Sequence, residues 1–170
     1  MVAFLRVDTF YQEHPGVRVR DLKRCIAVAH HAGGQLWAER LLMEHFLPDA
    51  ASQFGYAQRN RKYNLRKIRL AALGLVEDGG RQPLVFSGAT RQAARRARYL
   101  VKATDKEVDV PIPVPRYIAS KANRYARQAL ALEVLAISPR HEKLVTNETE
   151  RGFHRAVRSV CAERRTTIRS

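Results

Sequence analysis

The chain has 170 residues, enough for one domain that buries roughly two thirds of its unfolded surface. Hydrophobic residues make up 45% of it, which excludes a disordered basic tail. Charge is the anomaly, because 31 basic residues against 16 acidic ones give a formal net charge of +15, and most of the basic residues are arginines. This positive field indicates a polyanionic partner, either nucleic acid or an acidic protein surface.

Cysteine usage and hydropathy exclude several other classes. Cys25 and Cys161 lie far apart in the sequence and outside any metal-binding spacing, so we expect neither a zinc site nor a disulfide framework. The apolar run 2–5 is too short for a signal peptide, and no stretch approaches the length of a membrane span. We therefore expect a single domain, 1–170, that folds in a reducing cytoplasm and contacts no membrane.

The first half of the chain is predicted to be helical after a short strand at 2–7. From Arg18 apolar residues recur at spacings of three and four, and Gly33-Gly34 is expected to end or bend that helix. A second helix follows and ends before Pro48, with Trp37 and Phe46 as core anchors. One further helical turn is expected at 49–54, broken by Gly55.

A basic helix is predicted over 61–73, with Gly74 as its C-cap. Its apolar residues Leu65, Ile68 and Ala72 predict the buried face. Basic residues at i, i+4 and i+7 form an adjacent ridge, namely Lys62, Arg66 and Arg69.

The second half mixes strands and helices. We expect a strand at 84–86 and a helix over 89–98 with arginines 91, 95 and 98 on one side. A β-hairpin is expected to pair 99–103 with 107–114, because apolar residues there alternate with polar residues and prolines, which predicts one buried and one exposed face: Val108, Val110, Ile112 and Val114 against Glu107, Asp109, Pro111 and Pro113. Residues 132–137 are predicted as a strand, and Ser138-Pro139 opens a C-terminal helix with a third ridge, formed by arginines 151, 155 and 158. The fold class is therefore α+β: N-terminal helices, a small antiparallel sheet with a β-hairpin in the second half, and a long C-terminal helix.

The sequence contains no pattern typical of an enzyme. The six histidines do not form HExxH or any comparable ligand spacing, and no Gly-rich phosphate loop or GxSxG element is present. The acidic residues are scattered, whereas a metal-dependent nuclease needs them clustered. We therefore predict no catalytic residue, no metal and no cofactor.

The predicted site is the set of basic ridges. If six basic groups in and just before the 61–73 helix each neutralised one phosphate, DNA affinity would fall on the order of a thousandfold between 50 and 200 mM salt. The six are Arg59, Arg61, Lys62, Arg66, Lys67 and Arg69. Base-reading motifs and a stacking platform are missing, so sequence-specific recognition is not expected. The alternative for any single ridge is a solvated helix face. The residues assigned to the DNA- or partner-facing ridge are Arg59, Arg61, Lys62, Arg66, Lys67, Arg69, Arg91 and Arg95.

An ordered set of short motifs occupies the same region. Phe54-Gly55-Tyr56 is followed by Arg59 and by Tyr63 with Lys67, and then by Pro83-Leu84-Val85-Phe86-Ser87-Gly88 before a helix containing Arg91. This order resembles a family of small structural proteins of tailed bacteriophages that act in head–tail joining and tail completion. The resemblance covers residues 36–98 well and the remainder in outline. Its motif residues here are Tyr56, Tyr63, Pro83, Leu84, Ser87 and Gly88.

The resemblance implies a non-enzymatic virion protein, assembled in the host cytoplasm, that forms a homo-oligomeric ring at the neck. Its partners would be the portal-side adaptor and the tail terminator or tail tube proteins, with non-specific contact with DNA. The basic surface would face either the DNA channel or an acidic neighbouring ring, and the sequence does not choose between them. The alternative function is a non-specific nucleic-acid-binding module.

Overall fold

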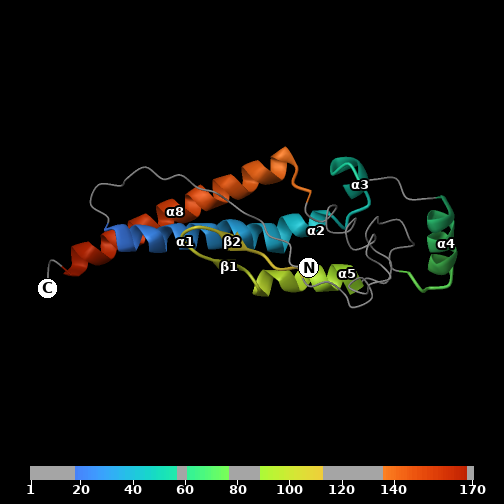
Figure 1. Ribbon diagram of the computed structural model, residues 1–170, viewed down its shortest axis with the longest axis horizontal. Helices are drawn as coiled ribbons and strands as arrows, with labels where there is room; N and C mark the ends of the chain where they lie inside the picture. Colours follow the sequence, from blue (N-terminus) through green and yellow to red (C-terminus); the bar gives the residue numbers. More distant parts are fainter. Residues whose placement is uncertain (1–17, 57–60, 77–88, 113–135, 168–170) are drawn as a thin grey trace.

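The computed structural model describes residues 18–56, 61–76, 89–112 and 136–167. Its frame is a pair of long antiparallel helices lying side by side (Figure 1). The first begins as α1 (Val19–Leu36), continues through the π-helical segment η1 (Trp37–Leu41), and ends as α2 (Leu42–Glu44). The second is α8 (Pro139–Thr167). The chain is α+β, as predicted, because a two-stranded antiparallel sheet packs against this pair.

The prediction that Gly33-Gly34 ends or bends the first helix is wrong. The helix passes through both glycines, which are buried, so the two predicted N-terminal helices are one continuous element. A glycine in a helix interior costs about 0.5–1 kcal/mol relative to alanine. Packing explains why it is kept: a Cβ on Gly33 would lie 2.2 Å from Thr149 Oγ1, and one on Gly34 would lie 2.6 Å from Val108 Cγ2.

The π-helical segment keeps a run of apolar residues on the core side. The Leu42 amide donates to the Trp37 carbonyl, five residues back, which is the hydrogen bond of a π turn. Trp37, Ala38, Leu41 and Leu42 are all buried there. Phe46 is buried as well, so the prediction that Trp37 and Phe46 are core anchors is confirmed.

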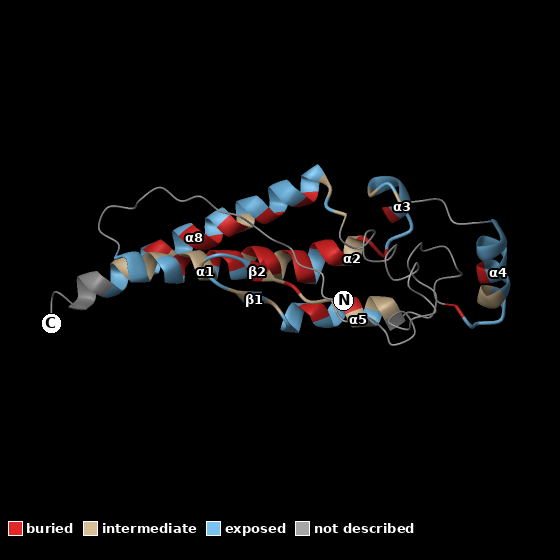
Figure 2. Cartoon of the chain, viewed as in Figure 1, coloured by how far each residue is buried: buried red, intermediate tan, exposed pale blue. Residues whose placement is uncertain are grey.

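The C-terminal helix begins where the sequence predicts it to begin. Pro139 occupies its first turn, and the Ser138 hydroxyl accepts a hydrogen bond from the His141 amide (3.2 Å). Val145, Phe153 and Val157 face inward along it (Figure 2). Gly152 of α8 faces α1. A Cβ added to it would lie 3.0 Å from the Ala32 Cβ, so the two helices approach closely there.

Cys25 and Cys161, which are distant in the sequence, belong to the same packed cluster between α1 and α8. Both are free thiols. Burial raises the pKa of the Cys25 thiol, and the neighbouring Asp21 and Cys161 act in the same direction.

The predicted hairpin is present with shorter strands. β1 (Lys102–Ala103) pairs antiparallel with β2 (Val108–Asp109). Val108 and Val110 are buried, which confirms the predicted alternation. The hairpin turn is tied to the long helix by the buried His30, whose Nδ1 donates to the Thr104 carbonyl (2.8 Å). Residues 136–138 are irregular rather than the end of the strand predicted at 132–137, whose first residues lie outside the described part.

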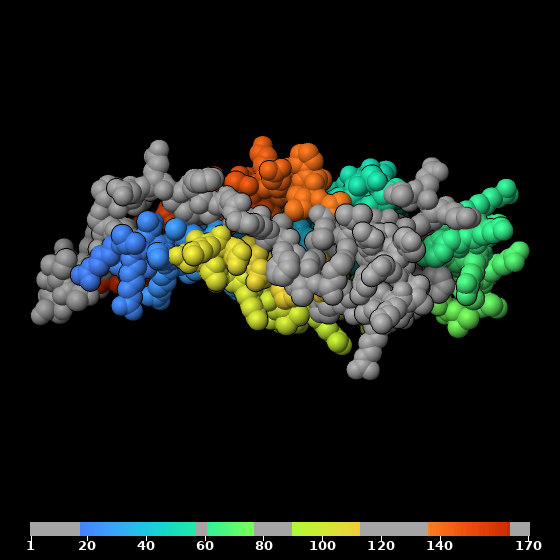
Figure 3. Space-filling model, viewed as in Figure 1, coloured from blue at the N-terminus to red at the C-terminus, as the bar shows by residue number. Residues whose placement is uncertain are grey.

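Three shorter helices complete the described part. They are α3 (Ala50–Gln53), α4 (Arg61–Ala72) and α5 (Ala89–Arg95), the last continued by the 3-10 turn η3 (Arg96–Tyr99). Gly55 and Gly74 have positive φ and follow α3 and α4, as predicted. α5 packs against α2, whereas α4 lies at one end of the elongated molecule, opposite the start of α1 (Figures 1 and 3). The strands predicted at 2–7 and 84–86 lie outside the described residues.

None of the described helices is both long enough and apolar enough to cross a membrane.

The glycine contact makes a prediction about stability. Gly33→Ala gains about 1 kcal/mol of helix propensity but forces a methyl group onto Thr149, and overpacking of this kind costs typically 1–3 kcal/mol. We therefore expect a net destabilisation in chemical denaturation. The control is the same change in a Thr149→Ala background, where the contact atom is gone and the alanine should be neutral or stabilising. Equal effects in the two backgrounds would refute the contact.

Candidate interaction surface

The central basic ridge lies on the exposed side of α4. Lys62, Arg66 and Arg69 are exposed, as is Arg61 at the start of the helix. Within the described part of the chain, Arg61, Arg66 and Arg69 form no ion pair. The periodicity of the basic residues therefore predicted an exposed cationic row correctly.

The inner side of α4 was predicted wrongly. Lys67, assigned to the ridge, is only 4% exposed, whereas Leu65 is 46% and Ile68 57% exposed. The less exposed positions are Lys67, Leu70 and Ala71, almost opposite the predicted apolar face on a helix of 3.6 residues per turn. The apolar spacing indicated one face of the helix but not which face packs. Among the described residues, the main core cluster includes no side chain of α4.

α4 consequently presents two kinds of side chain to solvent. Leu65 and Ile68 form an apolar stripe beside the cationic row, and Leu73 and Leu75 after the helix are 71% and 63% exposed. Clustered exposed apolar residues typically mark an interaction site. We call this combination of stripe and row the α4 surface.

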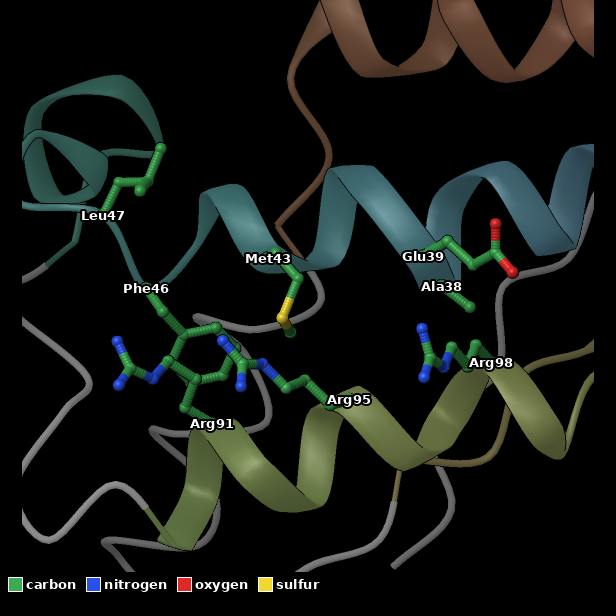
Figure 4. Close-up of a pocket in the computed structure, with 8 residues that line it drawn as sticks. All are labelled: Ala38, Glu39, Met43, Phe46, Leu47, Arg91, Arg95 and Arg98. Atoms are coloured by element: carbon green, nitrogen blue, oxygen red, sulfur yellow. The ribbon is translucent and has the colours of Figure 1, made fainter.

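A second candidate is a cleft of about 380 Å³ between the first long helix and α5. Figure 4 shows Arg91, Arg95 and Arg98 on α5 and η3, on the side that faces Met43 of α2 and Phe46, which follows α2. Ala38, Glu39 and Leu47 complete the lining. The predicted ridge of α5 is thus one wall of this cleft, which we call the α5 groove.

The three arginines of the groove differ in their surroundings. Arg91 is half-buried, whereas Arg95 is exposed and forms no ion pair with any described residue. Arg98 lies over the Tyr99 ring, 4.5 Å from its centroid, and donates to the Tyr99 hydroxyl. The one carboxylate of the groove, Glu39, accepts a hydrogen bond from Gln35 (2.5 Å).

The third ridge, on α8, is partly neutralised within its own helix. Glu148 contacts Arg155 at 2.6 Å and Arg151 at 3.9 Å. Arg158 donates from Nε to the His154 carbonyl (3.2 Å). This ridge therefore fits the alternative of a solvated helix face better than the other two do.

A polar cluster that the sequence analysis did not predict lies at the junction of α2, α3 and α8. His141 is fully buried and donates from Nε2 to Glu44 Oε2 (3.0 Å), which also accepts from Arg140 (3.1 Å). The buried His45 is hydrogen-bonded through Nδ1 to the Tyr56 hydroxyl (2.5 Å) and stacks on Phe54 at 3.9 Å. The ring centroids of the two histidines are 5.9 Å apart.

This cluster links α2, the segment after α3, and α8. Its members come from positions about a hundred residues apart, so no spacing motif could have revealed them. No group of three or more metal-ligating side chains occurs among the described residues. The motif residue Tyr56 thus has a structural position in the cluster, beside His45.

The pKa of Glu44 reflects its place in the cluster. Burial acts to raise it, but the hydrogen bond from His141, the charge of Arg140 and the hydrogen bond from Gln53 together hold the pKa below its ordinary value. The ionised carboxylate is therefore the form that the fold stabilises.

The remaining predicted site residues divide into two groups. Tyr63, 39% exposed, lies one turn before Lys67 on α4. Outside the described residues are Arg59, Pro83, Leu84, Ser87 and Gly88.

Comparison with protein-family models, with curated proteins and with solved structures finds no match to this chain.

The Glu44 carboxylate makes stability depend on pH. The pKa of Glu44 is lower in the folded state than its ordinary value of 4.5. The carboxylate therefore stabilises the fold at pH values above 4.5, and this stabilisation is lost as the pH falls through the pKa of the folded state. Glu44→Gln should cost about 1–2 kcal/mol at neutral pH and flatten the acid limb of a plot of unfolding free energy against pH. The exposed Glu150 offers a matched control, since Glu150→Gln should leave that limb unchanged.

Proposed function

We propose that this chain is a structural virion protein of a tailed bacteriophage that joins head and tail, as a tail-completion or neck component. The order of motifs from Tyr56 to Gly88 supports the family. The observation that carries the proposal is the α4 surface: an exposed cationic row and apolar stripe on a helix set apart from the core, a contact element without reactive groups.

In this proposal the helix pair is the scaffold of the protein, and α4, at one end of the molecule, is the element that contacts a partner (Figure 1). Arginines that meet phosphates without base contacts suit a channel through which any DNA sequence passes. Phosphates would leave the apolar stripe formed by Leu65 and Ile68 without a partner, however. An acidic protein ring that also carries apolar side chains can contact both the cationic row and the apolar stripe. We therefore place α4 against a neighbouring ring, either portal-side adaptor or tail terminator, in a homo-oligomeric assembly within the virion.

Removal of the cationic row tests this assignment. Virions produced with Lys62→Gln, Arg66→Gln and Arg69→Gln together should accumulate as unjoined heads and tails in electron micrographs. The fold should persist, because exposed substitutions usually change stability by less than about 0.5 kcal/mol each.

The matched control removes the same charge from the opposite end of the molecule, where Arg18, Arg20 and Arg24 are exposed on or beside the first turn of α1. Their triple replacement by Gln should leave joining intact. Normal joining by the α4 variant, or equal loss in both variants, would refute the role of this surface.

A nucleic-acid-binding module predicts a different result with purified protein. It would bind duplex DNA tightly as a monomer, with an affinity loss on the order of a thousandfold between 50 and 200 mM salt. The joining protein should bind DNA weakly and form rings only when neck or tail components are added. Tight binding by the monomer would favour the module.

A further inference from the structure

We propose that the α5 groove is a binding site for a short acidic segment of a partner protein, in which carboxylates flank an apolar side chain. The inference goes beyond the joining role and does not depend on it, because the groove lies on different elements from the α4 surface. Its support is the chemistry of the two walls.

One wall is apolar. Phe46 and Ala38 are buried at its base, Met43 is half-buried, and Leu47, at one end of the groove, is 45% exposed. These side chains come from η1, α2 and the residues that follow α2, which contribute Trp37, Leu41 and Phe46 to the larger buried core cluster, so packing holds the wall in place before any partner arrives. A rigid apolar wall favours a ligand that brings an apolar side chain, since ordering costs are low and water is released.

The other wall is cationic. Arg91, Arg95 and Arg98 recur at i, i+4 and i+7, which spreads their origins over about 10 Å of helix. Each guanidinium presents a planar fork that matches a carboxylate with two parallel hydrogen bonds. Within residues 89–104 the sequence has no acidic side chain at all. Glu39 across the groove is one carboxylate opposite three cations, and Gln35 already donates to it.

The dimensions select a peptide over a nucleic acid. A cleft of about 380 Å³ lies at the small end of ligand pockets, which run from about 300 to 1,000 Å³. A DNA duplex could touch only the rim arginines, because the space between two packed helices does not admit it. Phosphates would also leave the Met43 and Phe46 wall without a partner.

The test measures fluorescence anisotropy of a short labelled peptide with the repeated unit Glu-Leu-Glu-Ser, titrated with the full-length chain. The groove variant is Arg95→Gln with Arg98→Gln, which spares the half-buried Arg91. The control variant is Arg96→Gln with Lys102→Gln, which removes the same charge from exposed neighbours that do not line the groove. Circular dichroism and thermal melts verify that both variants fold.

We expect the groove variant to weaken the peptide's affinity at least about tenfold, whereas the control should change it by less than about twofold. Peptides with the repeats Gln-Leu-Gln-Ser and Glu-Ser-Glu-Ser should both bind worse than the parent peptide, because each satisfies one wall only. The Met43→Gln variant, which makes the apolar wall polar, should also lose affinity for the parent peptide.

Three outcomes would overturn the proposal. Equal losses of peptide affinity in the groove and control variants would show that the peptide binds through the general positive charge of the chain and not through the groove. Equal affinity for the Glu-Ser-Glu-Ser peptide would remove the apolar wall from recognition. Selective loss of affinity for a DNA duplex of mixed sequence, with the peptide unaffected, would assign the arginines to nucleic acid.

Discussion

Three glycines allow the two long helices and the hairpin to approach one another closely, and the rest of this structure depends on that packing. Gly33 and Gly152 face the opposite helix, and Gly34 faces the hairpin; a Cβ would overlap a neighbour at Gly33 and Gly34 and would be crowded at Gly152. The backbone cost of glycine in a helix is about 1 kcal/mol per residue, less than the packing gained when α8 and the hairpin can both reach the same turn. From this turn outward, Val145 and Val108 close the core on either side.

The sequence predicted correctly those elements whose ends or pairing depend on residues close by in the chain. Pro139 and Ser138 define the start of α8, Gly74 follows the end of α4, and the alternation around Val108 predicts the hairpin. The prediction at Gly33-Gly34 was wrong because a pair of glycines is found both where a helix ends and where a helix packs closely against a neighbour. The contacts that distinguish the two, Thr149 for Gly33 and Val108 for Gly34, come from far along the chain. The π-helical segment has no sequence signature and depends on the core around Trp37.

The candidate surfaces show the same division between local and distant causes. Periodicity predicted which basic residues share a row, such as Arg91, Arg95 and Arg98, but not what lies opposite them. The apolar wall with Met43 and Phe46 comes from another helix. On α4 the spacing of apolar residues predicted that Leu65 and Ile68 are buried, but both are exposed, and Lys67, which was assigned to the exposed ridge, is buried. The polar cluster around Glu44 required the fold, since His141 approaches it from α8.

Charge distribution connects the scaffold with both surfaces. Glu44, Glu148 and Asp105 are each paired with basic residues of the scaffold, so the frame neutralises part of its own charge. The stretches 61–76 and 89–104, which form the α4 surface and the arginine wall of the groove, contain no acidic residue. Like charges so concentrated repel one another and weaken the compact state, unless anions are supplied from outside. The sequence thus places its acids where they stabilise the helix pair and omits them where a partner can supply the missing carboxylates or phosphates.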